Sequence, residues 1–409
     1  MLARVLLSWA LVCAGAVSPL VAQEPGQPTT RAEALARERE TKAAALSPPE
    51  HSRLERTLIW LENDRLLERI LNPAQGFYPK LGNITPGSGL AFGIAFRQPA
   101  VLGGHADFNT FAAGSLDKYW MLDATLAFPR LADGAVFADV KIQRYNFPEE
   151  DFFGLGPDSR RDAEASYREK GTVVGGGAGV RPTDWFSLSG RVNYRTPRLS
   201  DSAEVRIGDL GLDFPGLSGL VEQPDFVRYE VSADLNYRQP QGNPRRGGRY
   251  FIAFQRYDDQ DFNRYTFNRL EADIQQYVPF LNDRRVIALR GFTSLSKADE
   301  GQQVPFYLQR TLGGPDDLRG FRRFRFRDEN VLLLQAEYRW EIFTAMDGAI
   351  FYDAGMVAPT RRALSLGDLE SDYGIGFRFG TINGVFLRVE GAFGSSGGKH
   401  LVIRYGHVF

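Results

Sequence analysis

The sequence is poor in cysteine, and this scarcity restricts the chemistry open to the protein. It holds one cysteine, Cys13, which lies inside an apolar run near the start of the chain. A disulfide framework needs paired cysteines, and thiol chemistry needs a cysteine in the mature protein. Neither is expected here, because the segment that carries Cys13 has the features of a leader that is removed.

The sequence also lacks any long apolar run after its first residues. A membrane helix needs about 20 mainly apolar residues. Residues 1–22 combine Arg4, an apolar run from Val5 to Val17, and Pro19 followed by small residues, which is typical of a secretory signal peptide. Hydropathy alone would class the rest of the chain as soluble. That conclusion is unsafe, because the spans of a β-barrel alternate and never form apolar runs.

No excess of either charge is present, and no catalytic motif stands out. The 49 Lys and Arg residues balance 50 Asp and Glu residues, whereas nucleic-acid-binding proteins usually carry a basic excess. Gly-x-Ser-x-Gly occurs once, at Gly394–Gly398, between two predicted strands and not at the strand-to-helix turn that a nucleophile elbow requires. An outer loop with Asp258, Asp259 and Asp261 could hold Ca²⁺, but a solvated turn is favoured. The histidines show no metal-ligand spacing; they are His51, His105, His400 and His407. We expect no nucleic acid, catalytic residue, cofactor or metal.

Glycine and phenylalanine are abundant instead, at 43 and 30 residues, a composition that suits strands and turns. The segment 23–75 comes first and differs from the rest. Its beginning is polar and reads as a linker. Ser47, Pro48 and Pro49 form a helix-start signal, and leucines at helical spacing follow until Pro73. We predict a short amphipathic periplasmic helix, docked on its own protein or resting on a membrane or a partner.

From Gly76 onward the periodicity of apolar residues changes from helical to two. In 226–238, for example, Val227, Tyr229 and Val231 share one face, while charged and polar residues share the other. Alternation of this kind places the two sets on opposite faces of a strand. Many such segments are about ten to thirteen residues long, which suits a tilted membrane span and exceeds the usual globular strand. Aromatic residues at their ends, including Tyr119 with Trp120, suggest an interfacial girdle.

Sixteen such segments can be counted, and they predict an all-β fold, a 16-stranded antiparallel transmembrane β-barrel over residues 76–409. The predicted strands are 76–84, 88–97, 104–115, 118–129, 134–146, 171–181, 185–195, 226–238, 248–258, 263–277, 284–296, 329–343, 347–357, 371–381, 384–393 and 400–409. With the N-terminus in the periplasm, the long connections 147–170, 196–225, 297–328 and 358–370 all fall outside. The first strand is short and carries Pro79, which is tolerated mainly on strand edges. We therefore predict the weakest line of the wall between the first and last strands.

Two segments carry the most specific sequence signals. The last residues alternate and end on an aromatic, with Tyr405 and Phe409 on one face; this ending looks like the signal by which bacterial outer-membrane barrels are recognised during their assembly. The second segment, 312–327, places arginines between phenylalanines after a Gly-Gly-Pro-Asp-Asp cluster. Arg suits both carboxylates and phosphates. The sequence leaves open whether Arg322, Arg323, Arg325 and Arg327 meet carboxylates in the lumen or phosphates of lipopolysaccharide.

These residues resemble the BamA/TamA superfamily of outer-membrane assembly and secretion barrels. Leu318-Arg319-Gly320-Phe321 is similar to the family's (Val/Leu)-Arg-Gly-(Phe/Tyr) motif on its sixth outer loop. Ala336-Glu337-Tyr338-Arg339-Trp340 resembles the next strand, and Phe351-Tyr352-Asp353-Ala354-Gly355 the one after it. The terminal Phe409 completes the set. The resemblance covers about the last quarter of the chain at high specificity.

The resemblance implies that loop 297–328 folds back into the lumen and that Arg319 pairs with Asp353 on the inner wall. The alternation of residues agrees, because Asp353 falls on the polar face while Ile350 and Tyr352 fall on the other. Gly320 would allow a tight turn, and Phe321 completes the motif. Glu337 and Arg339 are further candidates for the inner wall. An ordinary solvated, arginine-rich loop is the alternative.

Function is also inferred from the resemblance. It implies a non-enzymatic barrel in the bacterial outer membrane that assists insertion or translocation of proteins, or of lipids. Transport members carry periplasmic POTRA domains, small α/β units that do not fit into 23–75, so a partner that bears POTRA domains, or a secreted protein, is expected. Further expected partners are outer-membrane lipid, lipopolysaccharide and, during biogenesis, the outer-membrane assembly machinery. A passive pore or structural barrel is the alternative function.

Overall fold

The computed structural model describes residues 40–41, 73–85, 88–202, 208–343, 345–381, 384–395 and 398–404. The chain divides into two units, Met1–Arg56 and Thr57–Phe409. Only Glu40 and Thr41 of the first unit are described, and both are helical. The predicted signal peptide and the predicted helix after Ser47 lie outside the described residues. No helix in the described part of the chain is long and apolar enough to cross a membrane.

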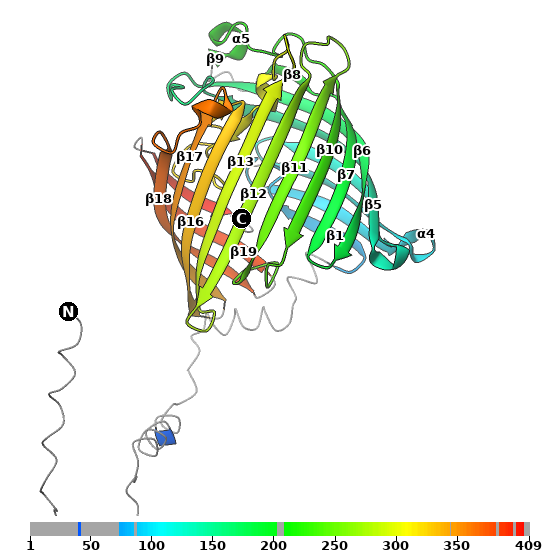
Figure 1. The fold of residues 1–409 in the computed structure, drawn as a ribbon, viewed down its shortest axis with the longest axis vertical. Coiled ribbons are helices and arrows are strands. Elements are labelled where there is room, and N and C mark those ends of the chain that lie inside the picture. Colours follow the sequence, from blue (N-terminus) through cyan, green and yellow to red (C-terminus); the bar gives the residue numbers. More distant parts are fainter. Residues whose placement is uncertain are drawn as a thin grey trace, which may run out of the picture. The chain divides into compact units, whose positions relative to one another are not determined.

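The second unit is a barrel whose wall consists of sixteen antiparallel strands, which confirms the predicted fold (Figure 1). Each wall strand pairs with the next along the chain. The wall strands are β1 (Gly76–Gly82), β2 (Ala91–Ala100), β3 (Ala106–Ser115), β4 (Trp120–Leu131), β5 (Val136–Phe152), β6 (Ala165–Thr183), β7 (Phe186–Arg195), β10 (Phe226–Asn236), β11 (Gly247–Asp259), β12 (Phe267–Phe280), β13 (Arg285–Ala298), β16 (Asn330–Phe343), β17 (Met346–Ala358), β18 (Glu370–Thr381), β19 (Gly384–Gly394) and β20 (Lys399–Arg404).

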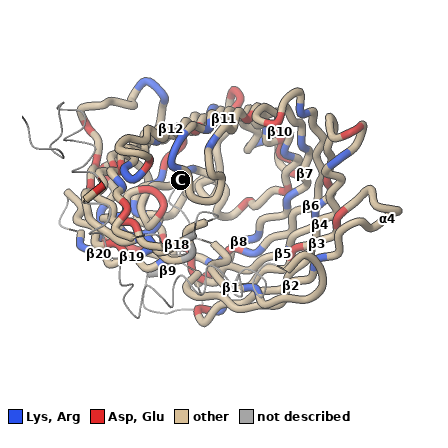
Figure 2. Tube along the Cα trace, turned by 90° about the horizontal axis from the view of Figure 1, so that it is seen from below, with Lys and Arg blue, Asp and Glu red and all other residues tan. Residues whose placement is uncertain are grey.

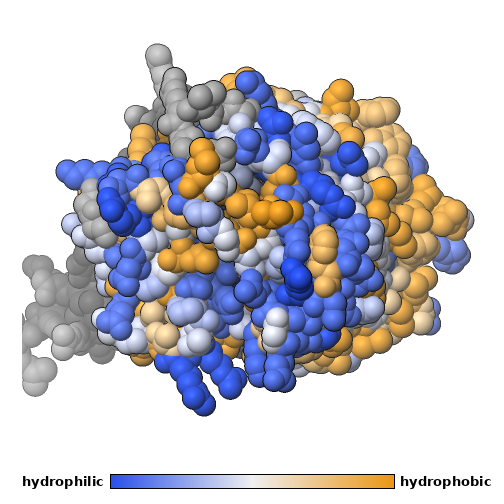
Figure 3. Space-filling view, turned by 90° about the horizontal axis from the view of Figure 1, so that it is seen from above, coloured by the Kyte–Doolittle hydropathy of each residue, from blue (hydrophilic) through white to orange (hydrophobic). Residues whose placement is uncertain are grey.

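Alternation along the strands separates an apolar outer face from a polar inner face. In β12, Leu270, Ile274 and Val278 are exposed, whereas Glu271 and Gln275 between them are buried. A side-chain period of two produces this separation. Figure 2 shows the wall strands arranged as a ring, and Figure 3 shows a largely hydrophobic flank at the right of the view beside a mostly hydrophilic end. Apolar side chains thus cover the outside of the wall.

The structure corrects two details of the prediction. β5 continues to Phe152 and β6 begins at Ala165, so half of the predicted loop 147–170 belongs to these two paired strands. The extension was not predicted because Pro148 usually interrupts a strand. The ladder shifts register between Phe147 and Glu150, and such an irregularity accommodates a proline, which cannot donate a hydrogen bond. Tyr119 does not belong to a girdle on the outside, because its side chain is buried and bonds to the Glu149 carbonyl.

The long connections gather at one end of the barrel. Beyond β7, the chain forms β8 (Arg198–Asp201), β9 (Gly208–Asp209) and α5 (Leu210–Asp213), and both short strands pair with the extension of β6. The opposite end carries shorter connections, including α4 (Val101–Gly104) and η1 (Ala132–Gly134). Another short helix, η3 (Arg361–Ala363), follows β17. The parity of the predicted connections, long at one end and mostly short at the other, agrees with this arrangement.

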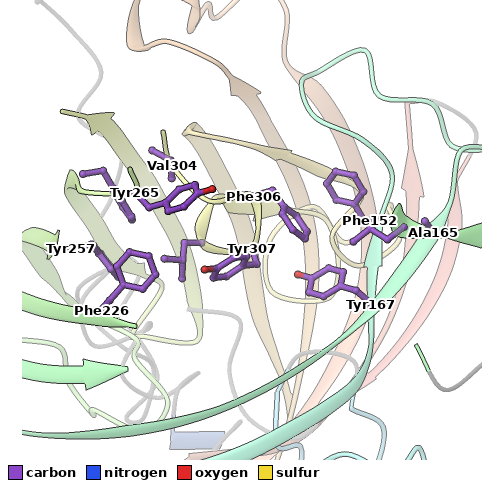
Figure 4. Packing of buried hydrophobic residues seen from close by; sticks show 12 residues of the cluster. Phe152, Ala165, Tyr167, Phe226, Tyr257, Tyr265, Val304, Phe306 and Tyr307 are labelled. Atoms are coloured by element: carbon purple, nitrogen blue, oxygen red, sulfur yellow. The ribbon is translucent and has the colours of Figure 1, made fainter. Parts of the chain in front are cut away.

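A cluster of aromatic side chains fills the inside of the long-loop end (Figure 4). Phe306 lies in η2 (Phe306–Leu308), a short helix in the connection between β13 and β16. Its ring packs against Phe152 of β5 and Tyr167 of β6, with centroid distances of 5.4 and 5.2 Å. These edge-on contacts join the longest connection to the opposite side of the wall.

Candidate functional site

The connection between β13 and β16 contains a short hairpin of its own. β14 (Arg310–Leu312) pairs with β15 (Phe326–Asp328), which closes residues 313–325 into a loop. We call residues 313–325 the inner loop. Gly313 has a φ of 109°, and a Cβ there would lie 2.2 Å from the Arg322 carbonyl oxygen. Only glycine fits this conformation and this close approach.

Apolar side chains fix the inner loop to the inner face of the barrel. Leu318 and Phe321 of the loop are buried with Leu312 and Phe326 at its base. They pack against the wall through Val331 and Leu333 of β16 and Val357 of β17. The rings of Phe321 and Phe326 meet edge-on at 5.3 Å. Burial of these side chains supplies the non-directional part of the attachment, at roughly 25 cal/mol per Å² of apolar surface.

Arg319 provides the directional part, and its side chain is fully buried. Its Nε and Nη2 donate to the two carboxylate oxygens of Asp353 in β17, at 2.7 and 2.8 Å. Its Nη1 donates to Glu337 of β16 at 2.7 Å and to Glu390 of β19 at 3.3 Å. The guanidinium also lies 3.4 Å from the centroid of the Phe351 ring. A two-pronged contact of this kind is among the strong charge-assisted hydrogen bonds.

The carboxylates keep Arg319 charged in spite of its burial. Burial alone would lower its pKa, but the nearby charges of Asp353, Glu337 and Glu390 raise the pKa above its usual value. Removing one partner from a buried pair leaves the other charge uncompensated. The attachment of the inner loop therefore depends on all members of the cluster.

The structure brings together four of the predicted residues and adds others. Glu337 also accepts a bond from Nε of Arg339 at 2.8 Å, so Arg319, Asp353, Glu337 and Arg339 form one network. Prediction missed three neighbours that complete it, although alternation had already placed some on the inner face. Gln335 donates to Asp353 at 3.2 Å, and Arg378 donates to Glu337. Glu390 accepts from Arg319.

Gly320 is needed for a different reason from the one expected. It does lie in a turn, closed by a bond from the Phe321 N–H to the Leu318 carbonyl oxygen at 3.1 Å. Its φ is not positive, however. A Cβ at this position would lie 2.6 Å from the Cβ of Asp372 and 2.6 Å from the backbone nitrogen of Gly394. Glycine is required because the inner loop approaches β18 and β19 so closely.

The four arginines after Phe321 contact protein groups at the long-loop end. Arg322 pairs with Glu164, Arg323 donates to the Glu149 carbonyl at 3.2 Å, and Arg325 donates to the Ser159 hydroxyl at 2.7 Å. Arg327 donates to the Phe306 carbonyl at 3.0 Å. Three of them therefore bridge the inner loop to β5 and the β5–β6 connection. In this structure all four side chains contact protein groups, and their contact with phosphates of lipopolysaccharide stays a prediction.

Other sequence signals fall elsewhere. Tyr405 and Phe409 lie outside the described residues. Asp259 accepts bonds from the backbone N–H groups of Asp261, Phe262, Arg264 and Tyr265, so its carboxylate shapes the β11–β12 loop. Across the described ranges, no group of three or more His, Cys, Asp or Glu residues could hold a metal ion.

Comparison with known proteins identifies the architecture. A family model described as the Omp85 superfamily domain matches residues 109–395. The fold is similar to BamA from Haemophilus ducreyi lacking POTRA domains 1–3, with 15% identity, a TM-score of 0.60, and 90% of this chain and 81% of that chain covered. No curated protein matches the sequence significantly.

Two further solved structures are similar. CdiB from Acinetobacter baumannii shares 14% identity at a TM-score of 0.51, with 81% of this chain and 59% of that chain covered. CdiB from Escherichia coli shares 13% identity at a TM-score of 0.53, with 80% and 61% covered. Identities this low establish a common fold and nothing finer.

Proposed function

Because the chain belongs to the Omp85 superfamily, we propose that it assists the insertion or translocation of proteins at the bacterial outer membrane. The observation that carries the proposal is the inner loop held to one side of the wall by the buried Arg319 network. A network of this kind holds the loop in place while its ion pairs are intact and releases it when they break, which suits a barrel that opens and closes for a substrate.

The predicted weak seam between the first and last strands supports the same proposal. β1 has seven residues and includes Pro79, and β20 is described over six. Within the described residues, no ladder joins β1 to β20, whereas every other neighbouring pair of wall strands has one. Unpaired backbone groups cost several kcal/mol each in lipid. A substrate strand that pairs with this edge would remove the cost.

The expected partners follow from the surfaces of the barrel. Exposed aliphatic and aromatic side chains on the outer face, such as Ile274 and Val231, suit outer-membrane lipid. A POTRA-bearing or secreted protein is the proposed partner for transport. We propose lipopolysaccharide as the neighbour of the long-loop end.

A crosslink across the seam tests the function. Leu81 of β1 and Leu401 of β20 are both exposed on the wall. Replacing both with cysteine and joining them with a short bismaleimide should reduce insertion of an unfolded barrel protein into proteoliposomes at least tenfold. Ion conductance of the purified protein should stay within twofold, because the lumen is unchanged.

The control crosslinks two strands that already pair. Val231 of β10 and Phe254 of β11 lie opposite each other in the ladder and are exposed. The same bismaleimide there should leave insertion unchanged. The predicted removal of Cys13 with the leader gives both variants a cysteine-free background. Equal activity of the two crosslinked proteins would contradict the proposal and favour a passive or structural barrel.

A further inference from the structure

Three arginines form a row on the inner wall next to the seam. Arg378 of β18 lies directly opposite Arg388 of β19, which lies directly opposite Arg404 of β20. Neighbouring strands are about 4.8 Å apart, so the row spans roughly 10 Å. Like charges that face each other across a ladder are destabilising. The row therefore needs anions close by.

The carboxylates of the wall form ion pairs with this row but do not supply a hydrogen-bond acceptor for every donor. Asp347 of β17 lies opposite Arg378, but it accepts bonds of 2.9 and 3.1 Å from Arg245 instead. Glu390 lies 3.6 Å from Nε of Arg388 and 3.7 Å from Nη2 of Arg378, beyond hydrogen-bond distance. Glu337 does accept from Nη2 of Arg378, yet it also serves two other arginines.

Among the described residues, five guanidinium nitrogens of the row consequently have no hydrogen-bond acceptor. They are Nε and Nη1 of Arg378, Nε and Nη1 of Arg388, and Nε of Arg404. Arg378 and Arg388 are almost completely buried. Buried polar groups are nearly always paired, and each exception calls for an explanation. An anion that uses several donors at once is the explanation that matches their chemistry.

The inner loop already places one anion on the row. Asp316 accepts from Nη1 of Arg404 at 2.8 Å and from Nη2 of Arg388 at 3.4 Å. The carbonyl oxygen of Pro315 also accepts from Nη2 of Arg388, at 3.1 Å. The side chains of Asp316 and Arg404 are 29% and 15% exposed, whereas the side chain of Arg388 is fully buried. The row is thus reached from the lumen past Asp316.

We propose that Arg378, Arg388 and Arg404 form a binding site for a phosphate group, and that Asp316 occupies this site as an internal ligand while the inner loop is docked. A carboxylate has two oxygens and leaves five donors unused. A phosphate presents more acceptor oxygens and can bridge neighbouring guanidinium groups. The group could arrive as dissolved phosphate or, since the row borders the seam, as the headgroup of a lipid. The site does not depend on the transport function proposed above.

Removal of the internal ligand tests the site. In Asp316→Ala, isothermal titration with pyrophosphate at pH 8 in a non-ionic detergent should show at least a tenfold gain in affinity over the unaltered protein. The matched control is Asp317→Ala, which removes the same charge one residue away and should change affinity less than twofold. Adding Arg404→Gln to Asp316→Ala should abolish the gain. Heat-modifiable migration on gels checks that each variant remains folded.

A lipid arm distinguishes the two sources of phosphate. Nanodiscs that contain phosphatidic acid are compared with nanodiscs of phosphatidylcholine, with the same variants. A gain for Asp316→Ala with pyrophosphate assigns the site to dissolved phosphate. A gain only with phosphatidic acid assigns it to a lipid headgroup. The proposal is overturned if Asp316→Ala and Asp317→Ala bind both ligands equally, or if Arg404→Gln leaves the gain intact.

Discussion

The β4 and β17 strands have similar lengths and similar alternating sequences, but their inner faces differ. No residue of β4 is buried, whereas most residues of β17 are. The inner loop packs on β16–β19, and its apolar contacts and ion pairs cover that part of the wall. Among the described residues, no comparable set of contacts covers the side near β1–β4. On this part of the wall, burial is therefore decided by where the inner loop docks.

The seam between β1 and β20 likewise separates a buried part of the wall from an exposed part. On one side, β18 and β19 hold buried Asp372, Arg378, Arg388 and Glu390. On the other side, β1 has no buried residue among its seven. Strands with few buried contacts open locally at low free-energy cost. We therefore expect opening at the seam to move β1 and β2 more than β18 and β19.

The largest expected effect comes from Arg319→Gln. This change leaves Asp353 and Glu390 buried without their main cation, and breaking a buried pair typically costs about 3–5 kcal/mol. Urea unfolding in detergent should show this loss, and limited proteolysis should cut the inner loop. Arg322→Gln is the control, because the pair of Arg322 with Glu164 is partly exposed and should contribute less than about 1 kcal/mol. Equal losses in the two variants would mean that the network does not hold the loop.

A smaller effect is expected for Gly320→Ala. The added methyl group would lie 2.6 Å from both the Cβ of Asp372 and the backbone nitrogen of Gly394, and overpacking of this kind costs about 1–3 kcal/mol. The measurement is again urea unfolding, with Gly367→Ala as the matched control. The nearest atom to a Cβ at Gly367 is the Ser365 hydroxyl at 3.5 Å. A Gly320→Ala protein as stable as the control would show that the inner loop can move away from β19 freely.

The smallest effect is a dependence of loop docking on pH. Burial raises the pKa of Asp317 to about 7, with Arg290 and Arg310 opposing the shift and Asp316 and Asp353 adding to it. An unfolded Asp ionises near pH ~3.9. The Asp317 carboxyl thus holds its proton more tightly when the loop is docked. This proton contributes its full stabilisation of the docked loop below about pH 4, and the contribution is lost as the pH rises through about 7.

Proteolysis of the inner loop should accordingly be faster at pH 8 than at pH 5.5. Burial also raises the pKa of Glu329 to about 7, with Asp328 adding to the shift, and the sign is the same. Asp317→Asn should remove part of the difference between the two pH values, and adding Glu329→Gln should remove most of the rest. A pH difference that persists unchanged in the double variant would assign the effect to other groups.

Much of the fold was predictable because one periodicity is repeated along the wall. Alternating residues set the number and direction of the strands, and the motif around Arg319 pointed to its contact with Asp353. The extension of β5 was missed because Pro148 reads as a break, although a shift in register accommodates it. Arg378 and Glu390 were not assigned to the site, since alternation places a side chain on the inner face without saying which loop will meet it. The reason for Gly320 likewise depends on the approach of β18 and β19, which are distant in the sequence.

A double-mutant cycle on Arg319 and Asp353 tests most directly whether this pair attaches the inner loop to the wall. Arg319→Gln, Asp353→Asn and the double variant are compared with the unaltered protein by urea unfolding in detergent. Residues in direct contact show interaction energies of about 0.5–3 kcal/mol, and the two-pronged contact at 2.7 and 2.8 Å predicts the upper part of that range. Losses that add without any interaction energy would contradict the account.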